Sequence, residues 1–253
     1  RLLHAVLLAL GFKLSLKKTV EPTNRGKILG LDFDCTVPAI KCTTERASKV
    51  LDSIFMFLEA PAEQSLADLD HWVCQLGFLA YHSSYGRAYM QSLYALKWLS
   101  PENRQKLVLG QSTESDLFAI SICWWVCVLS GDRILWKAST DEGDVHTVQS
   151  DSSEYAHCAF DSDGNASLGV FVRSRGEIIV LKELAAITHH VDVFSLPRGS
   201  LSMFLCDNLN VVTTLRHGRA KGSERFRRMF IKFWSVCESL DVHVASQFIR
   251  TKR

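Results

Sequence analysis

The sequence has no apolar run long enough to cross a bilayer, which needs about 20 residues. Its most apolar stretch, 117–129, is bounded by Asp116 and Asp132, and this pattern predicts a buried helix. The apolar start is followed by Gly11-Phe12-Lys13 instead of a small-residue cleavage site, so we expect no signal peptide. We therefore expect an intracellular protein, cytoplasmic or nuclear, with no membrane partner.

The eight cysteines form no C-x-x-C pair. Cys123 and Cys127 share a predicted helix face, yet no paired histidine or cysteine follows them at the spacing of a zinc site. Most cysteines lie in apolar runs, which indicates reduced core residues more than zinc ligands or disulfides. Glycine-rich phosphate loops and serine or cysteine nucleophile motifs are also missing, as are internal repeats.

What is present is ordinary for a folded protein: 47% apolar and 22% charged residues in a chain of 253. This length allows two modest domains, each with its own core. Because the sequence starts at Arg1 and stops abruptly at Thr251-Lys252-Arg253, we expect a fragment of a longer polypeptide.

The net charge of +2 hides an uneven distribution. Ten acidic residues lie between Glu114 and Asp163, and ten Lys or Arg lie between Arg216 and Arg253. A basic segment after an acidic one suits an anionic polymer bound near carboxylate-held metal. A solvated charged face is the alternative, and charge alone favours it.

Residues 1–138 divide into a short mixed segment and a helical region. In 1–42 we expect a helix near 3–10 and strands at 12–16 and 27–33, joined by a turn at 22–26. In 43–138, apolar residues recur at helical spacing. The predicted helices are 44–60, ended by Pro61, then 66–79, one after Gly86, and about 115–129.

A polar linker near 139–144 precedes a change of period from helical to alternating. In 144–253 we expect strands at 145–150, 155–160, 168–173, 201–206 and 242–249. Helices are expected at about 181–193, from Asn208, and at 224–240, and a turn at Asp161–Asn165. This order predicts an α/β domain with a mixed sheet and flanking helices.

Three acidic residues lie near the ends of predicted strands and helices. Asp151 ends the first strand of the sheet, Asp207 ends the fourth, and Glu183 lies near the start of the first helix. If the first and fourth strands are neighbours, the three carboxylates converge and repel one another unless a cation lies between them. Oxygen ligands suit Mg²⁺ or Mn²⁺, and two such ions can promote phosphodiester hydrolysis. The alternative is three ordinary acids at a strand end, a helix turn and a cap.

Basic residues follow these acids around a helix start, where phosphate contacts are natural. The candidate nucleic-acid-binding residues are Lys18, Asn208, Arg216, Arg219, Lys221, Arg225 and Arg228, and Arg227 lies among them. A solvated face is again the alternative. We expect Trp124, Trp125, Phe230, Phe233 and Trp234 to be core residues and not base-stacking platforms. His189-His190 is expected to serve packing, and His217 is the histidine best placed near a substrate.

Three runs resemble the ribonuclease H domains of retroelements, above all those of tyrosine-recombinase (DIRS-like) retrotransposons. They are Val148–Ser153, Lys182–Ile187, and Cys206-Asp207-Asn208 with Leu215–Gly218. The resemblance implies a ribonuclease H-like fold in which Asp151, Glu183 and Asp207 hold the metal and catalyse hydrolysis of the RNA strand of an RNA–DNA hybrid.

The upstream chain follows the same family order. Gly11–Ser15 with Lys18 resembles the end of the reverse-transcriptase palm, where the lysine meets phosphate, and Ile28-Leu29-Gly30 resembles the "LG" hairpin that grips the primer. Leu76–Leu79, Gly86–Tyr89 and Leu93-Tyr94 resemble thumb and connection helices. The resemblance therefore implies a palm remnant (1–42), a helical thumb or connection (43–138) and a ribonuclease H-like domain (144–253). Its partners would be a hybrid or template-primer and the rest of the retroelement polyprotein.

The sequence departs from the family in three respects. The polymerase aspartates would precede Arg1, the stretch Tyr155-Ala156-His157 replaces a Gly-Trp-Gly-like motif, and the fourth acid would follow Arg253. These departures keep two alternatives open. One is a catalytically inactive nucleic-acid-binding module from a decayed or truncated element, and the other is an interaction scaffold.

Overall fold

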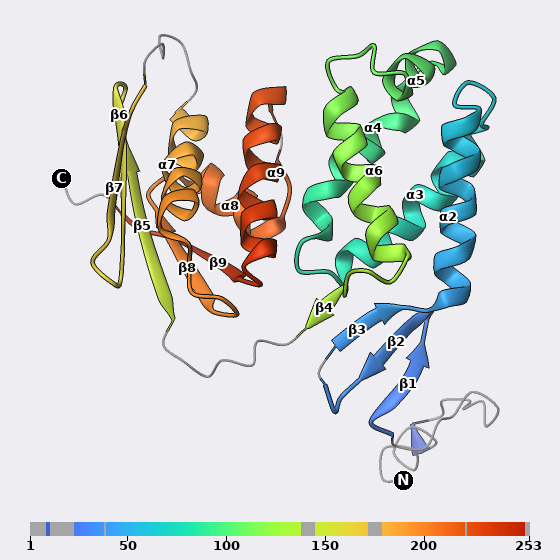
Figure 1. Ribbon diagram of the computed structural model, residues 1–253, viewed down its shortest axis with the longest axis horizontal. Coiled ribbons are helices and arrows are strands. Elements are labelled where there is room, and N and C mark those ends of the chain that lie inside the picture. The colour runs from blue at the N-terminus through green and yellow to red at the C-terminus, as the bar shows by residue number, and fades with distance from the viewer. Residues whose placement is uncertain are drawn as a thin grey trace.

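The structure, a computed structural model, describes residues 9–10, 23–37, 39–137, 145–171, 179–220 and 222–250. Its elements form a small sheet, a group of helices and a larger sheet with its own helices (Figure 1). The expected helix near 3–10, the strand at 12–16 and the linker near 139–144 lie outside the described residues, apart from Ala9 and Leu10.

The small sheet is antiparallel, with strand order β1-β2-β3-β4. Its strands are β1 (Arg25–Ile28), β2 (Leu31–Asp34), β3 (Ala39–Cys42) and β4 (Trp136–Lys137). The single strand expected at 27–33 is wrong, because Leu29 and Gly30 both adopt positive φ (50° and 78°) and turn the chain back on itself. Glycine takes this conformation without strain, so Leu29-Gly30 forms a tight hairpin.

The helical region agrees with the predicted pattern in its longest helices. It contains α2 (Thr44–Glu59), α3 (Leu66–Tyr81), η2 (Gly86–Met90), α4 (Gln91–Ala95), η3 (Leu96–Trp98), α5 (Pro101–Val108) and α6 (Ser115–Leu129). The single helix expected after Gly86 is instead a short α-helix between two 3₁₀ turns. Helix α5 was not predicted, although Ser100 caps it by accepting from Asn103 N and Pro101 is its first residue.

The larger sheet has the order β7-β6-β5-β8-β9. Its strands are β5 (His146–Ser152), β6 (Ala156–Asp161), β7 (Ala166–Val170), β8 (Leu201–Cys206) and β9 (His243–Phe248). Strands β5, β6 and β7 pair antiparallel, whereas β8 runs parallel to both β5 and β9. The sheet is therefore mixed, as predicted, and its first and fourth strands are neighbours.

Three helices accompany this sheet: α7 (Ile179–Phe194), α8 (Leu209–His217) and α9 (Glu224–Ser239). Helix α7 packs against β5, β6 and β7, and α9 packs against α7. The face of β5 that α7 covers carries Val148 and Ser150, which are buried. The next residue, Asp151, is exposed. Strand alternation thus sends Asp151 to the face away from α7.

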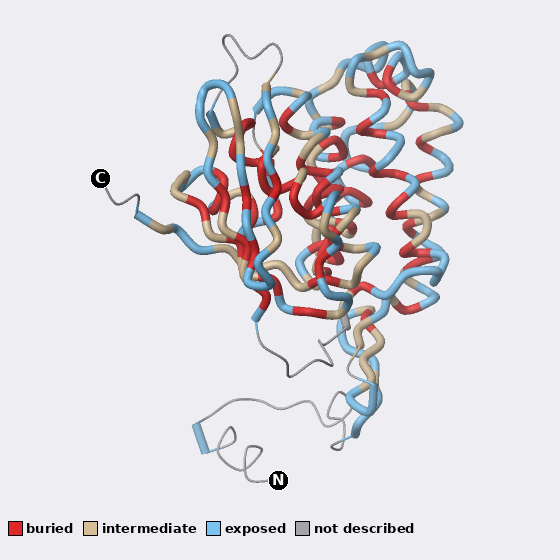
Figure 2. The backbone as a smooth tube through the Cα atoms, turned by 60° about the vertical axis from the view of Figure 1, so that its left-hand side comes forward, coloured by how far each residue is buried: buried red, intermediate tan, exposed pale blue. Residues whose placement is uncertain are grey.

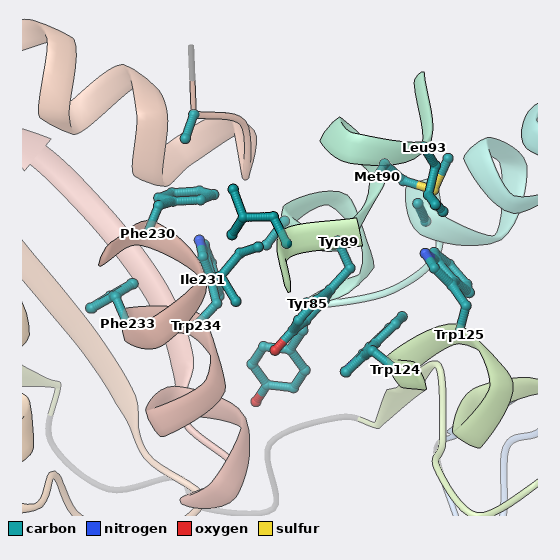
Figure 3. Packing of buried hydrophobic residues seen from close by; sticks show 14 of the residues in the cluster. Tyr85, Tyr89, Met90, Leu93, Trp124, Trp125, Phe230, Ile231, Phe233 and Trp234 are labelled. Atoms are coloured by element: carbon teal, nitrogen blue, oxygen red, sulfur yellow. The ribbon is translucent and has the colours of Figure 1, made fainter. Parts of the chain in front are cut away.

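The buried core continues from the helical region into α9 (Figures 2 and 3). Tyr89 stacks on Trp124 with ring centroids 4.6 Å apart, and Tyr85 meets Trp234 edge to face. The Tyr85 hydroxyl also donates to the carbonyl of Val242 at 3.1 Å. The tryptophans and phenylalanines expected in the core, Trp124, Trp125, Phe230, Phe233 and Trp234, are all buried.

The division of the chain into three parts, 1–42, 43–138 and 144–253, remains a prediction.

The cysteines are free, but the expectation that most are core residues is wrong. Only Cys206 and Cys237 are buried, whereas Cys35, Cys74, Cys123 and Cys158 are exposed. The reason is local: an apolar run in a helix or strand still has an outward face, and Cys123 and Cys158 lie on such faces. Among the described residues no helix is both long and apolar enough to span a membrane.

Candidate metal centre

The carboxyl ends of β5 and β8 bring two of the predicted acids together. These strands are parallel, and Gln149 lies opposite Leu205 in the ladder. Two residues further along each strand are Asp151 and Asp207, so the two aspartates leave the sheet at the same edge. Adjacent strands lie about 4.8 Å apart, which places the two backbones within reach of one shared ligand.

Glu183 reaches the same edge from the covering helix. It lies in the second turn of α7, is 2% exposed, and is held by the residue that follows Asp151. Its Oε1 accepts from the backbone N–H of Ser152 at 3.2 Å and from the Ser152 hydroxyl at 2.7 Å. These two bonds fix one carboxylate oxygen and leave Oε2 on the side of Cys206, whose Sγ is 3.7 Å away.

Burial and like charge both act on Glu183. Its pKa is raised from the ordinary value of 4.5, first because the carboxylate is buried, and further because Asp207 and Asp151 are close by. The Ser152 hydrogen bonds oppose this rise in pKa. The negative charges of Asp207 and Asp151 therefore both act on the Glu183 carboxylate, and a bound cation would relieve this repulsion.

The ligand atoms do not form one equally tight group. Those of Glu183, Cys206 and Asp207 lie within 4.8 Å of one another, whereas Asp151 lies outside this group. Burial raises the pKa of the Cys206 thiol to about 12, so the thiol stays protonated and is a poor metal ligand on its own. The donors suited to a cation are then carboxylate oxygens, which is the set preferred by Mg²⁺ or Mn²⁺.

Sequence reasoning did not find Ser152 or Cys206, although both contact Glu183. Ser152 follows a predicted strand end directly, and a hydroxyl next to a candidate carboxylate is a usable signal for an orienting residue. Cys206 offered no signal beyond its place before Asp207. Lys182, next to Glu183, is also buried, and its ammonium donates to the carbonyl of Glu154 at 2.7 Å.

The predicted phosphate contacts have mixed surroundings. Asn208 caps α8, because its Oδ1 accepts from the backbone N–H of Asn210 and of Val211. Arg216 is exposed and donates to the carbonyl of Ser246 at 3.2 Å. Arg219 and Arg225 are exposed as well, while Lys18 and Lys221 lie outside the described residues.

Part of the basic segment is neutralised inside the molecule. Arg228 forms ion pairs with Glu224 at 2.7 Å and with Asp116 at 2.9 Å, and Arg227 pairs with Glu114. The acidic and basic segments recognised in the sequence therefore meet each other where α6 and α9 begin. Arg228 consequently has less charge to offer to a phosphate than Arg219, which is exposed and joins none of these pairs.

No family model matches the sequence, and no curated protein matches it either. Among solved structures, the chain is similar to three of a foamy viral protease-reverse transcriptase. One is a form designated dRH in complex with double-stranded DNA, one is in complex with an RNA/DNA hybrid, and one is in complex with double-stranded DNA. Sequence identities are 13%, 14% and 12%, and TM-scores 0.36, 0.35 and 0.35. The alignments cover 99%, 97% and 99% of this chain but only 42%, 32% and 50% of those chains.

Proposed function

We propose that this chain is the C-terminal part of a retroelement reverse transcriptase and that its sheet domain hydrolyses the RNA strand of RNA–DNA hybrids in the manner of ribonuclease H. The observation that carries the proposal is the meeting of Glu183 and Asp207, with Asp151 beside them, at the carboxyl edge of two adjacent parallel strands. The strand order supports the proposal, because the first strand lies beside the fourth, as convergence of the three carboxylates requires.

In this proposal the chain's own residues orient the reaction. Asp207 and Glu183 hold Mg²⁺ or Mn²⁺, with Asp151 as a further ligand. Ser152 positions Glu183 through its two hydrogen bonds. When bound, the metal supplies an activated water and charge stabilisation at the departing oxygen. Arg216 on the exposed side of α8 and Arg219 just beyond its end would contact backbone phosphates.

The test is cleavage of a labelled RNA–DNA hybrid by the full chain with Mg²⁺, with Mn²⁺ and with EDTA. We expect metal-dependent cleavage that falls at least 100-fold in Asp151→Asn, Glu183→Gln and Asp207→Asn, because each removes a charged ligand. The matched control is Asp52→Asn, since Asp52 is exposed on α2. Cleavage that survives Glu183→Gln or Asp207→Asn would overturn the proposal.

One observation favours a second candidate, a nucleic-acid-binding module that does not cleave. Asp151 lies outside the tight ligand group, and a protonated thiol occupies a place in that group. This candidate predicts hybrid binding that weakens steeply with salt and no metal-dependent product. Binding without cleavage would support it over the nuclease, and negligible binding even at low salt would refute both.

A further inference from the structure

A second cluster of potential ligands lies at the opposite end of β5 from the candidate nuclease site. His146 opens β5, Asp161 ends β6, Asp163 lies in the turn before β7, and His190 projects from α7. His146 and Asp151 are five positions apart along the strand, which is about 16 Å. Neither the resemblance nor the proposed function uses these side chains.

The cluster is more than a group of surface acids. His146 and Asp161 have side chains that are 5% and 2% exposed, and His190 is fully buried. The side chain of Asp163 is 60% exposed and provides an open side. Potential ligand atoms of His146, Asp161 and Asp163 all lie within 4.8 Å of one another.

His146 is poorly explained as an ordinary core residue. Its Nδ1 is buried and has no hydrogen-bond partner. Its Nε2 points into the cluster, 3.6 Å from Asp161 Oδ2 and 3.5 Å from Asp163 Oδ2, which is too long for good hydrogen bonds. Two ligands of a tetrahedral zinc ion with bonds of about 2.0–2.1 Å are roughly 3.3–3.4 Å apart. The spacing therefore matches edges of a coordination tetrahedron better than hydrogen bonds.

His190 approaches the cluster from α7 and contacts Asp161. Its Nδ1 lies 3.1 Å from the Ser167 hydroxyl, and its Nε2 lies 3.2 Å from Asp161 Oδ2. The Ser167 hydroxyl also lies 3.4 Å from the carbonyl of Ala159, which can only accept. When the Ser167 hydroxyl donates to His190 Nδ1, the Nε2–H of His190 donates to Asp161 Oδ2, so His190 orients this carboxylate.

The surrounding bonds keep Asp161 ready to act as a ligand. Its Oδ1 accepts from the backbone N–H of Asp163 and of Asn165, and Oδ2 accepts from the Asn165 side chain at 2.9 Å.

We propose that His146, Asp161 and Asp163 form a binding site for a first-row divalent metal of the zinc type, in which His190 orients Asp161. The site would join β5, the β6–β7 turn and α7. An imidazole beside two carboxylates suits Zn²⁺ better than Mg²⁺, which takes oxygen ligands. The acids at the other end of β5 have no histidine in their ligand group, so the two ends of one strand select different metals.

The probe is Zn²⁺ added to the metal-free full chain, with affinity measured by competition against a chromophoric chelator. We expect one high-affinity zinc per chain, a rise in melting temperature on zinc addition, and a tetrahedral visible spectrum with Co²⁺. Asp163→Asn and His146→Gln should each weaken zinc binding at least 10-fold. Because Asp163 is exposed, its variant should fold even if the His146 variant does not, and circular dichroism checks both.

Two controls separate this site from others. Asp52→Asn alters an exposed acid elsewhere, and Glu183→Gln alters the candidate nuclease site, so neither should change zinc affinity. Unchanged zinc binding in Asp163→Asn, zinc binding lost only in Glu183→Gln, or no zinc binding at all would each overturn the proposal. None of these results depends on hybrid cleavage, so the two proposals fail separately.

Discussion

Glu183→Gln should stabilise the metal-free protein at neutral pH. The substitution keeps the size of the side chain, and the amide oxygen can still accept both hydrogen bonds from Ser152. What it removes is a buried negative charge close to Asp207 and Asp151. Removing an unfavourable charge of this kind commonly stabilises the fold by about 0.5–2 kcal/mol. For a chain of this size each kcal/mol shifts the melting temperature by about 2–4 °C.

The sign of the pH dependence follows from the raised pKa of Glu183. A carboxyl whose pKa is higher in the folded state binds its proton more tightly there than in the unfolded chain. The ionised group therefore destabilises the fold above its folded pKa, and this cost disappears as pH falls toward the ordinary value of 4.5. The advantage of Glu183→Gln should be full at pH values above the folded pKa and should disappear as pH falls below about 4.5.

The assay is thermal unfolding in EDTA and in millimolar Mg²⁺, with Glu63→Gln as the matched control. Glu63 is exposed in the turn between α2 and α3. Mg²⁺ at ten times Kd should stabilise the unsubstituted chain by about 1.4 kcal/mol, which raises its melting temperature by about 3–6 °C, and should leave Glu183→Gln unchanged. A variant that is less stable than the unsubstituted chain in EDTA at pH 7 would refute the reasoning on like charges.

Three further outcomes are expected. A thiol-alkylating reagent at neutral pH should label exposed Cys158 rapidly and leave Cys237, whose pKa burial raises, unlabelled until unfolding; mass spectrometry of digests reads this directly. Arg219→Gln should reduce the slope of log binding constant against log salt concentration for the hybrid by about one. Arg228→Gln should change this slope less, because Arg228 pairs with acidic residues of the chain itself. Binding titrations at several salt concentrations measure both slopes. Glu238→Ala should lower the melting temperature by about 2–6 °C, because it removes the carboxylate that accepts from the Trp124 indole at 2.9 Å; an unchanged melting temperature would contradict a stabilising role for the pair.

Much of the fold follows from the spacing of apolar residues and from the residues that end each helix or strand. Helix α6 and strand β8 have the predicted bounds, 115–129 and 201–206, because long runs with one period leave few alternatives. The small sheet was harder to predict, because β3 and β4 have four and two residues and pair across the whole helical region. Such short strands carry almost no periodic signal, so their existence depends on tertiary contacts.

The residues of the candidate sites also differ in how far the sequence alone predicts them. Asp151 and Asp207 could be found from sequence because strand ends are readable and parallel neighbours place them at one edge. The surroundings of Glu183 could not be found, since they depend on which side chain of β5 meets α7. His190 was expected to serve packing, and its approach to Asp161 and Ser167 depends on the register of β6 and β7 beneath the helix.

The place of Asp151 outside the tight ligand group has a physical explanation that does not require a different fold. Strand alternation directs this side chain to the face away from α7, while the parallel pairing of β5 and β8 runs its strand beside the one that leads to Asp207. Turning the carboxylate toward Glu183 and Asp207 brings a third negative charge into a partly buried space, which is unfavourable without a counter-charge. Alternation and repulsion therefore both favour an exposed Asp151. A bound divalent cation reverses that balance, so metal affinity should fall most when the charge that stays in place, Glu183 or Asp207, is removed.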